Sequence, residues 1–128
     1  MKKTILSLII VLITMTSCTQ NGSEQQSNSN AIYRLFPTQN MWTFIKLNTR
    51  NGQMWQVQYD VKDSNRFETI LNSESQTTRE TEVNDRFTLC PTQNMYTFLL
   101  LDQFDGRTWQ VQWSTEAKNR FIIPIAKE

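Results

Sequence analysis

The stretch PTQNMWTF at residues 37–44 recurs as PTQNMYTF at residues 91–98, with one aromatic residue exchanged for another. The displacement that carries the first stretch onto the second also relates two shorter segments, namely WQVQ at 55–58 and 109–112 and NRF at 65–67 and 119–121. No gap interrupts these matches. A fixed spacing that is kept over so many residues indicates an internal duplication, so one structural unit is written twice in this chain.

Each copy alternates apolar and polar residues with a period of two, which is typical of a β-strand with one buried and one wet face. WQVQYDV at 55–61 places its aromatic and valine residues on one face and its glutamines on the other, and TWQVQW at 108–113 repeats the pattern. MWTFIKL at 41–47 and MYTFLLL at 95–101 carry apolar groups on both faces, as a more central strand does. Further strands are predicted in YRLF, RFETIL, RFTLC and RFIIPI, which begin at Tyr33, Arg66, Arg86 and Arg120.

Two kinds of turn are predicted between these strands. NTRNGQ at 48–53 and DQFDGR at 102–107 contain Asn-Gly and Asp-Gly, and glycine tolerates the positive φ that a tight hairpin turn requires. Pro37 and Pro91 lack a backbone donor and are expected to end the lead-in strand. Thr-Gln-Asn then turns the chain, because Thr and Asn side chains bond to nearby backbone. The repeated PTQN is therefore interpreted as one corner built twice.

The sequence predicts an all-β fold of two tandem four-stranded antiparallel meanders. The first copy spans 31–71, a polar connector spans 72–85, and the second copy spans 86–128. Neither meander is large enough to be comfortably stable alone, so we expect the two to form one domain. The simplest arrangement packs them across a pseudo-twofold axis as a small sandwich or barrel. The alternative is a pair of propeller-like blades, which could close a ring only by oligomerisation.

Residues 1–17 have the layout of a secretory signal, with a basic start followed by an apolar run that ends near Met15. This run is too short to span a bilayer as a stable helix. Small residues then precede Cys18 directly. The layout resembles a bacterial lipoprotein signal, and the resemblance implies that Cys18 becomes the lipid-modified first residue of the mature chain. The alternative is an ordinary signal peptide followed by an incidental cysteine.

Residues 18–30 are predicted to be the lipidated cysteine and a flexible tether, because Thr19 to Asn30 contain no apolar side chain to bury. Leader and tether together resemble the small lipoproteins of Bacteroides-type bacteria. The resemblance implies a location at the outer membrane of the cell envelope, on the periplasmic side or at the cell surface. It is not a resemblance to a characterised domain family, and it transfers no catalytic residue.

The composition excludes much familiar chemistry. The chain has no histidine and only two cysteines, so it offers no Ser-His or Cys-His pair and no imidazole metal site. Cys90 stands where the first copy has Phe36, and a position that accepts both is interpreted as apolar and buried. Asp102 and Asp105 lie at one hairpin where the first copy has asparagines, so they are interpreted as turn residues. We predict a protein that is not an enzyme and needs no cofactor or metal.

The charge balance gives no electrostatic case for nucleic acid, because 11 basic and 12 acidic side chains remain once the two leader lysines are set aside. Binding residues are instead sought among amides and aromatic rings, which suit sugar hydroxyls or a partner's backbone. The candidates are the glutamines expected on the outward strand faces and two aromatic residues of the PTQN stretches: Gln56, Gln58, Gln110, Gln112, Trp42 and Tyr96. In the alternative interpretation the glutamines only solubilise the strands. Trp55 and Trp109 are predicted to lie in the core.

Three functions fit these observations. The first is a binding or accessory module that docks onto a larger envelope assembly, such as an outer-membrane transporter or an adhesin. The second is a glycan-binding module, and the third is a periplasmic inhibitor or immunity lipoprotein. Exposed aromatic rings in a concave groove would favour a glycan, and a flat apolar patch would favour a protein partner. A single self-complementary patch would favour a homo-oligomer.

Overall fold

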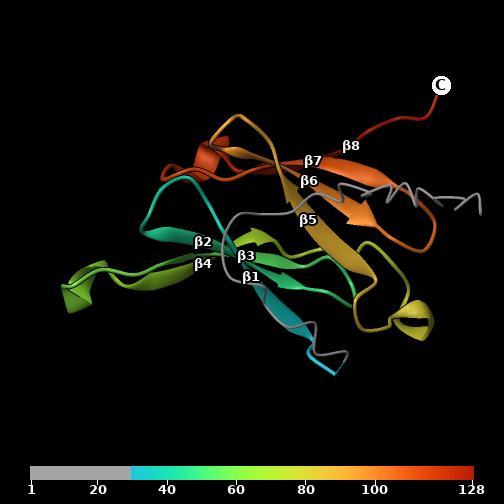
Figure 1. Ribbon diagram of the computed structural model, residues 1–128, viewed down its shortest axis with the longest axis horizontal. Coiled ribbons are helices and arrows are strands. Elements are labelled where there is room, and N and C mark those ends of the chain that lie inside the picture. The colour runs from blue at the N-terminus through green and yellow to red at the C-terminus, as the bar shows by residue number, and fades with distance from the viewer. Residues whose placement is uncertain (1–29) are drawn as a thin grey trace, which may run out of the picture.

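The structure is a computed structural model that describes residues 30–128, so the predicted leader, the lipidation site at Cys18 and all of the tether but Asn30 lie outside the described residues. Eight strands form two four-stranded antiparallel sheets, and the helical elements of the described part are three short 3₁₀ turns (Figure 1). The prediction of an all-β fold built from two tandem meanders is confirmed. The strands of residues 30–128 do not close into a barrel.

Each sheet is a meander in which every strand pairs with its neighbours in sequence. Sheet 1 contains β1 (Tyr33–Pro37), β2 (Thr43–Asn48), β3 (Met54–Gln58) and β4 (Phe67–Asn72). Sheet 2 contains β5 (Phe87–Pro91), β6 (Thr97–Asp102), β7 (Thr108–Gln112) and β8 (Phe121–Pro124). The 3₁₀ turns are η1 (Asp63–Asn65), η2 (Arg79–Thr81) and η3 (Ala117–Asn119). These strands fall where the alternating and β-branched segments of the sequence predict them.

The hairpin glycines have the backbone conformation that their turns require. Gly52 has a φ of 82° and Gly106 a φ of 77°, both in the left-handed region. Their amides donate to the carbonyls of Asn48 (3.0 Å) and Asp102 (2.8 Å), which closes the β2–β3 and β6–β7 hairpins. The predicted positions of the two hairpins are confirmed.

The PTQN stretches build the same corner twice. In the first copy the Asn40 amide donates to Thr38 Oγ1 (3.1 Å), and the Trp42 amide donates to Asn40 Oδ1 (2.9 Å). In the second copy Thr92 and Asn94 accept the equivalent bonds at 3.2 and 2.9 Å. Short polar side chains thus satisfy the backbone donors that the turn leaves unpaired, as their sequence predicts.

Alternation gives each sheet two faces, which we name after their central residues. The glutamine face of sheet 1 carries Phe36, Ile45, Leu47, Met54, Gln56 and Leu71, and the equivalent positions of sheet 2 are Cys90, Leu99, Leu101, Thr108, Gln110 and Ile125. The tryptophan face of sheet 1 carries Tyr33, Leu35, Phe44, Lys46, Trp55, Val57, Tyr59 and Ile70, and the equivalent positions of sheet 2 are Phe87, Leu89, Phe98, Leu100, Trp109, Val111, Trp113 and Pro124.

The core joins the glutamine face of sheet 1 to the tryptophan face of sheet 2. Its buried residues are Phe36, Ile45, Leu47, Met54, Leu71, Phe87, Leu89, Phe98, Leu100, Trp109, Val111 and Trp113. Ile45 is fully buried while its equivalent Leu99 is partly exposed, and Leu100 is fully buried while its equivalent Lys46 is partly exposed. The two copies therefore bury opposite faces.

This arrangement corrects one part of the predicted fold, the pseudo-twofold axis. A twofold axis would bury the same face of both copies, whereas these sheets stack front to back. The physical reason is that β2 and β6 carry apolar groups on both faces, so their pattern does not say which face is buried. Front-to-back stacking is how blades repeated around an axis meet, which is the alternative that the sequence left open.

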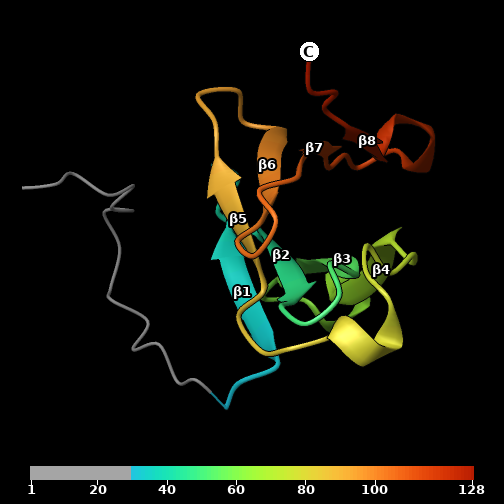
Figure 2. The ribbon, with the colours of Figure 1, turned by 90° about the vertical axis from the view of Figure 1, so that its right-hand side faces the viewer.

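Polar contacts join the two sheets at two places. Figure 2 shows β1 and β5 on one side of the molecule and β4 and β8 on the other. At the β4–β8 side Arg120 Nη1 donates to Thr69 Oγ1 (3.4 Å), and at the PTQN corners Gln39 Nε2 donates to the Gln93 carbonyl (3.4 Å). Polar contacts therefore frame the apolar interface between the two sheets.

The polar connector at 72–85 ties the two hairpins together. The backbone amide of Gln76 donates to the backbone carbonyl of Asn51 (2.7 Å). Arg107 of the second hairpin donates to the backbone carbonyl of Gln76 (2.9 Å). The Gln76 side chain also lies against Gly52, where an added Cβ would stand 3.0 Å from Gln76 Cγ. The connector is polar as its sequence predicts, and its backbone is held by both copies.

Candidate functional site

The four glutamines do not share an outward surface. Gln110 is exposed on sheet 2, as predicted, but Gln56 is fully buried in the core, which contradicts its predicted outward position. Neither amide atom of Gln56 has a hydrogen-bond partner. Gln58 and Gln112 are half-buried, and Gln112 Nε2 donates to the Asn119 carbonyl (2.9 Å). The prediction for Gln56 is wrong because sheet 1 buries its glutamine face and sheet 2 does not.

The two tryptophans of the WQVQ segments also differ. Trp109 lies in the core at 5 % exposure, as predicted. Trp55 lies on the open tryptophan face of sheet 1 and is half-buried, so its predicted core position is wrong. Cys90, expected to be buried like Phe36, is only half-buried because the glutamine face of sheet 2 is open.

Trp42 and Tyr96 lie at the PTQN corners, against the ends of β3 and β7. The Trp42 ring is 5.2 Å from the Tyr59 ring, and the Tyr96 ring is 5.0 Å from the Trp113 ring. Tyr96 remains 43 % exposed. Since the glutamine face of sheet 1 is turned toward the core and that of sheet 2 is open, the structure does not gather the six predicted binding residues into one site.

The first candidate site is the open tryptophan face of sheet 1. Tyr33 and Ile70 are 53 % and 58 % exposed. In the middle of the face the Lys46 ammonium lies 4.9 Å from the centre of the Trp55 ring and 2.5 Å from a Glu68 carboxylate oxygen. Aromatic and aliphatic side chains with one paired charge, spread over a sheet face, are typical of a surface that docks a protein.

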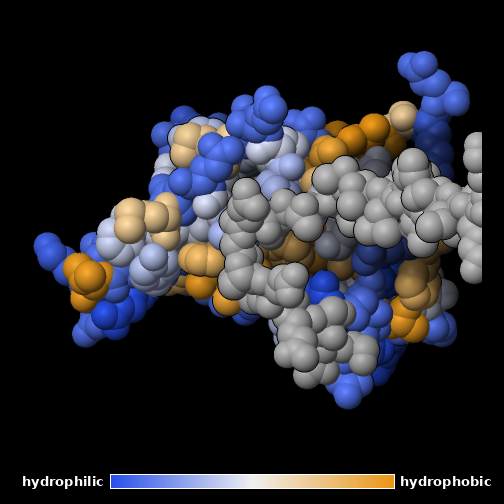
Figure 3. Space-filling view, in the orientation of Figure 1, coloured by the Kyte–Doolittle hydropathy of each residue, from blue (hydrophilic) through white to orange (hydrophobic). Residues whose placement is uncertain are grey.

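A second open surface is the glutamine face of sheet 2. Ile123 and Ile125 are 53 % and 46 % exposed there, beside the half-buried Leu99 and Leu101. Figure 3 shows apolar colour along β8, where the chain runs into its C-terminal tail. The two open surfaces lie on opposite outer sides of the two-sheet stack, since each sheet turns its other face toward the core.

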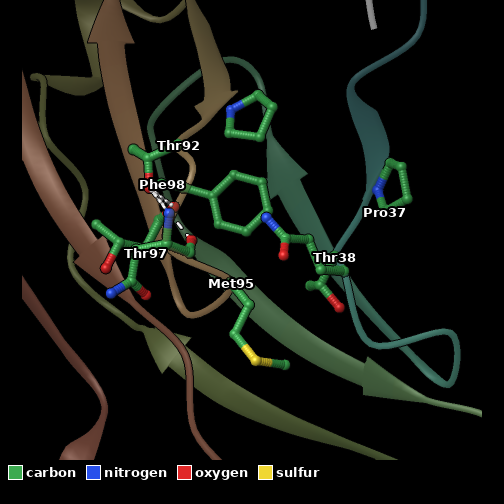
Figure 4. A pocket seen from close by; sticks show the side chains of 9 residues that line it. Pro37, Thr38, Thr92, Met95, Thr97 and Phe98 are labelled. Atoms are coloured by element: carbon green, nitrogen blue, oxygen red, sulfur yellow. Dashed lines mark hydrogen bonds between the residues drawn. The ribbon is translucent and has the colours of Figure 1, made fainter. Parts of the chain in front are cut away.

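A hollow of about 230 Å³ separates the two PTQN corners. Figure 4 shows Pro37 and Thr38 on one side, Thr92 and Thr97 on the other, and Phe98 and Met95 between them; the remaining lining residues are Gln39, Pro91 and Asn94. Its volume is below the ~300 Å³ at which pockets for drug-sized ligands begin. The threonine hydroxyls Thr38 Oγ1 and Thr92 Oγ1 are engaged in their own corners. The hollow is therefore too small for a drug-sized ligand, and two of its hydroxyls already have partners.

The sequence pattern did not predict a buried ion pair in sheet 2. Arg86 Nη2 donates to Asp102 Oδ2 (2.9 Å), and Asp102 is fully buried. Burial alone would raise the pKa of Asp102, but hydrogen bonds from Arg86 and from the backbone amides of Phe104 and Asp105 outweigh it and lower the pKa to about 2. The buried carboxylate is therefore held in its charged form. The pair has no counterpart in the first copy, where Ile32 and Asn48 stand at these positions.

Residues 30–128 contain neither a metal-binding cluster nor a membrane-spanning helix. No group of three or more His, Cys, Asp or Glu side chains in this part of the chain could hold a metal ion. No helix in it is long and apolar enough to cross a membrane.

Comparison with known proteins does not assign the chain to a class. No protein-family model matches it, and neither a curated protein nor a solved structure does.

Proposed function

We propose that the chain is a non-enzymatic binding or accessory module, held at the outer membrane by a lipid on Cys18, that docks a protein through an open sheet face. The observation that carries this proposal is the open tryptophan face of sheet 1 described above. A binding module needs a surface and no catalytic group, and this face is an apolar surface that the described fold leaves open.

The chemistry of the face favours a protein over a small molecule. Tyrosine and tryptophan are enriched in protein interfaces because each buries a large ring while its polar tip finds a partner. The central cation is paired with Glu68 and stacks over Trp55, so docking would not bury an isolated charge. A larger envelope assembly remains the proposed partner class, and an inhibitor or immunity lipoprotein would use the same face.

A glycan is the second candidate ligand, and the hollow between the PTQN corners is the observation that favours it. Its lining combines threonine, glutamine and asparagine side chains with Met95 and Phe98, a mixture that can contact sugar hydroxyls and sugar carbon faces. Titration of the labelled protein with neutral oligosaccharides tests this. Shifts of the backbone amide signals of Thr38 and Asn94 would support a glycan, and unchanged signals at millimolar sugar would remove it.

The docking proposal is tested by crosslinking the tagged full-length chain in its native membranes and identifying the captured proteins. Ile70→Glu places a charge on the open tryptophan face at a side chain that is 58 % exposed, so the fold should tolerate it. Phe104→Glu is the matched control, because Phe104 is 64 % exposed at the tip of the β6–β7 hairpin, outside both open faces. We expect the crosslinked species to be lost with Ile70→Glu and kept with Phe104→Glu. Equal recovery from both variants would reject docking through this face.

A further inference from the structure

We infer that a second copy of this chain docks on the open tryptophan face of sheet 1, using its own open glutamine face of sheet 2. This inference rests on the proposed function in one respect, that the open face binds a protein, and it names that protein. The intermolecular contact would continue the front-to-back stacking of the two sheets from one chain into the next.

The main argument is that the molecule already shows what covers each of these faces. Inside the chain, a glutamine face (sheet 1) packs against a tryptophan face (sheet 2). The two surfaces left over are again a glutamine face (sheet 2) and a tryptophan face (sheet 1), built from the equivalent positions of the duplicated sequence. Joining them between chains brings duplicated residues into the same kind of contact. A pair of surfaces related in this way is complementary and heterologous.

The hydrogen bond between the PTQN corners supports the same stacking. Gln39 Nε2 donates to the carbonyl of Gln93, which is its own equivalent in the second copy. If the next chain stacks in the same way, the Gln93 side chain would donate to the backbone carbonyl of Gln39 in that chain. The repeated PTQN stretch would then have two roles, which are the corner within each sheet and the contact between successive sheets.

Lys46 and Glu68 mark where the open face departs from the buried one. They stand at the positions of Leu100 and Ile122 in sheet 2. Burying this ion pair costs more free energy of desolvation than burying leucine and isoleucine. The contact between chains should therefore be weaker than the contact within the chain. Their mutual pairing at 2.5 Å limits that cost. A charged pair in place of leucine and isoleucine also suits a face that is exposed to water until the chains assemble.

The predicted tether is a poor competitor for this face. Thr19 to Asn30 contain no apolar side chain, so this stretch cannot replace water over Tyr33, Leu35 and Ile70 with apolar contact. The glutamine face of sheet 2 supplies Leu99, Leu101 and Ile123 for that purpose.

A heterologous contact closes into a ring or extends into a filament. In this fold each added chain contributes two sheets, so a closed ring would be a propeller whose blades come from several copies. Every junction between chains would also bring a second PTQN corner beside a first one, which repeats the hollow that lies between the corners within one chain.

The experiment uses native mass spectrometry of the purified full-length chain and of three variants. Ile70→Glu blocks the open tryptophan face, and Ile123→Glu blocks the open glutamine face. Both side chains are more than half exposed, and melting curves verify that the variants fold. Phe104→Glu is the control. We expect multimers from the unaltered chain and from Phe104→Glu, and loss of every species above the monomer from each of the other two variants.

Mixing the two blocked variants is the decisive step. Ile70→Glu keeps a usable glutamine face and Ile123→Glu keeps a usable tryptophan face, so the mixture should form a one-to-one heterodimer that cannot grow. Only a heterologous contact between these faces gives this result. Multimers that survive in either single variant, or a mixture that stays monomeric, would overturn the inference.

The two proposals can fail separately. An unaltered chain that is monomeric, but whose membrane crosslinks to a different protein are lost with Ile70→Glu, would overturn stacking and leave docking intact. A monomeric chain whose membrane crosslinks are absent, or unaffected by Ile70→Glu, would overturn both.

Discussion

Trp55 and Trp109 occupy the same position in the two copies of the duplicated unit, yet Trp109 is buried in the core and Trp55 lies on an open face beneath the Lys46 ammonium. The two side chains share their neighbours in sequence and their place in a strand. They differ because the sheets stack front to back, so each copy offers the opposite face to the core.

This relationship predicts unequal effects of the same substitution. Trp109→Ala should lower the free energy of unfolding by about 3–5 kcal/mol, because it removes a buried ring and leaves a cavity. Trp55→Ala should cost less, because its ring is partly in water before the substitution. Urea denaturation at a concentration where the chain is monomeric measures both. Equal losses of unfolding free energy in the two variants would show that Trp55 is buried in solution.

Gln56 should be a destabilising residue. Its amide is fully buried and neither polar atom is paired, so Gln56→Met should raise the free energy of unfolding by about 1–3 kcal/mol. The equivalent substitution Gln110→Met is the matched control, because Gln110 is exposed and should change stability by less than about 0.5 kcal/mol in the monomer. Thermal melting of both variants is the measurement. A lower melting temperature for Gln56→Met would mean that its amide is satisfied in solution.

The Arg86–Asp102 pair should dominate the stability of sheet 2. Asp102→Asn keeps a residue that can build the turn, as Asn48 does in the first copy, but removes the buried carboxylate that pairs with Arg86 and leaves Asp105 at 3.5 Å as its remaining acidic partner. The expected cost is about 3–5 kcal/mol. Adding Arg86→Ile, the residue type found at the equivalent position, should recover part of the loss. Denaturant melts of the single and double variants check this, and additive losses would contradict a coupled pair.

Acid should weaken the same pair. The pKa of Asp102 is lowered from 3.8 to about 2 in the folded chain, so its contribution is fully present above pH 4 and is lost as the pH falls toward 2. The shift corresponds to about 2 kcal/mol. We expect the unaltered chain to lose more stability than Asp102→Asn between these pH values. Parallel pH profiles of the two proteins would show that Asp102 does not titrate in this way.

The two hairpin glycines should tolerate alanine to different degrees. Both have positive φ, so each substitution should cost about 1 kcal/mol in backbone strain. Gly52→Ala should cost more than Gly106→Ala, because its new Cβ would meet Gln76 Cγ at 3.0 Å whereas nothing lies within 4 Å at Gly106. Melting temperatures of the two variants give the order. The reverse order would place the connector away from Gly52 in solution.

Lipidation is tested by Cys18→Ala in the full-length chain. We expect the folded protein to move from the membrane fraction to the soluble fraction, because the variant loses the acyl chains that hold it at the bilayer. Fractionation followed by a melting curve is the measurement, and Cys90→Ala is the matched control that should stay with the membrane. Persistent membrane attachment of Cys18→Ala would reject the lipid as the anchor.

Local patterns were enough to predict much of the fold. The repeated PTQN and WQVQ stretches predicted a duplication, the period of two predicted the strands, and Asn-Gly and Asp-Gly predicted the hairpins at Gly52 and Gly106. These features depend on interactions within a few residues, such as the positive φ of glycine and the bonds from Thr and Asn to nearby backbone. The expected PTQN corners formed for this reason.

Only the tertiary structure decided which residues are buried. Gln56 lies in the core while its equivalent Gln110 lies in water, and the Arg86–Asp102 pair joins two residues that no sequence pattern connects. The physical reason is that a strand with apolar groups on both faces can bury either one. The choice depends on the partner sheet across the interface, and a strand's own sequence does not contain that partner.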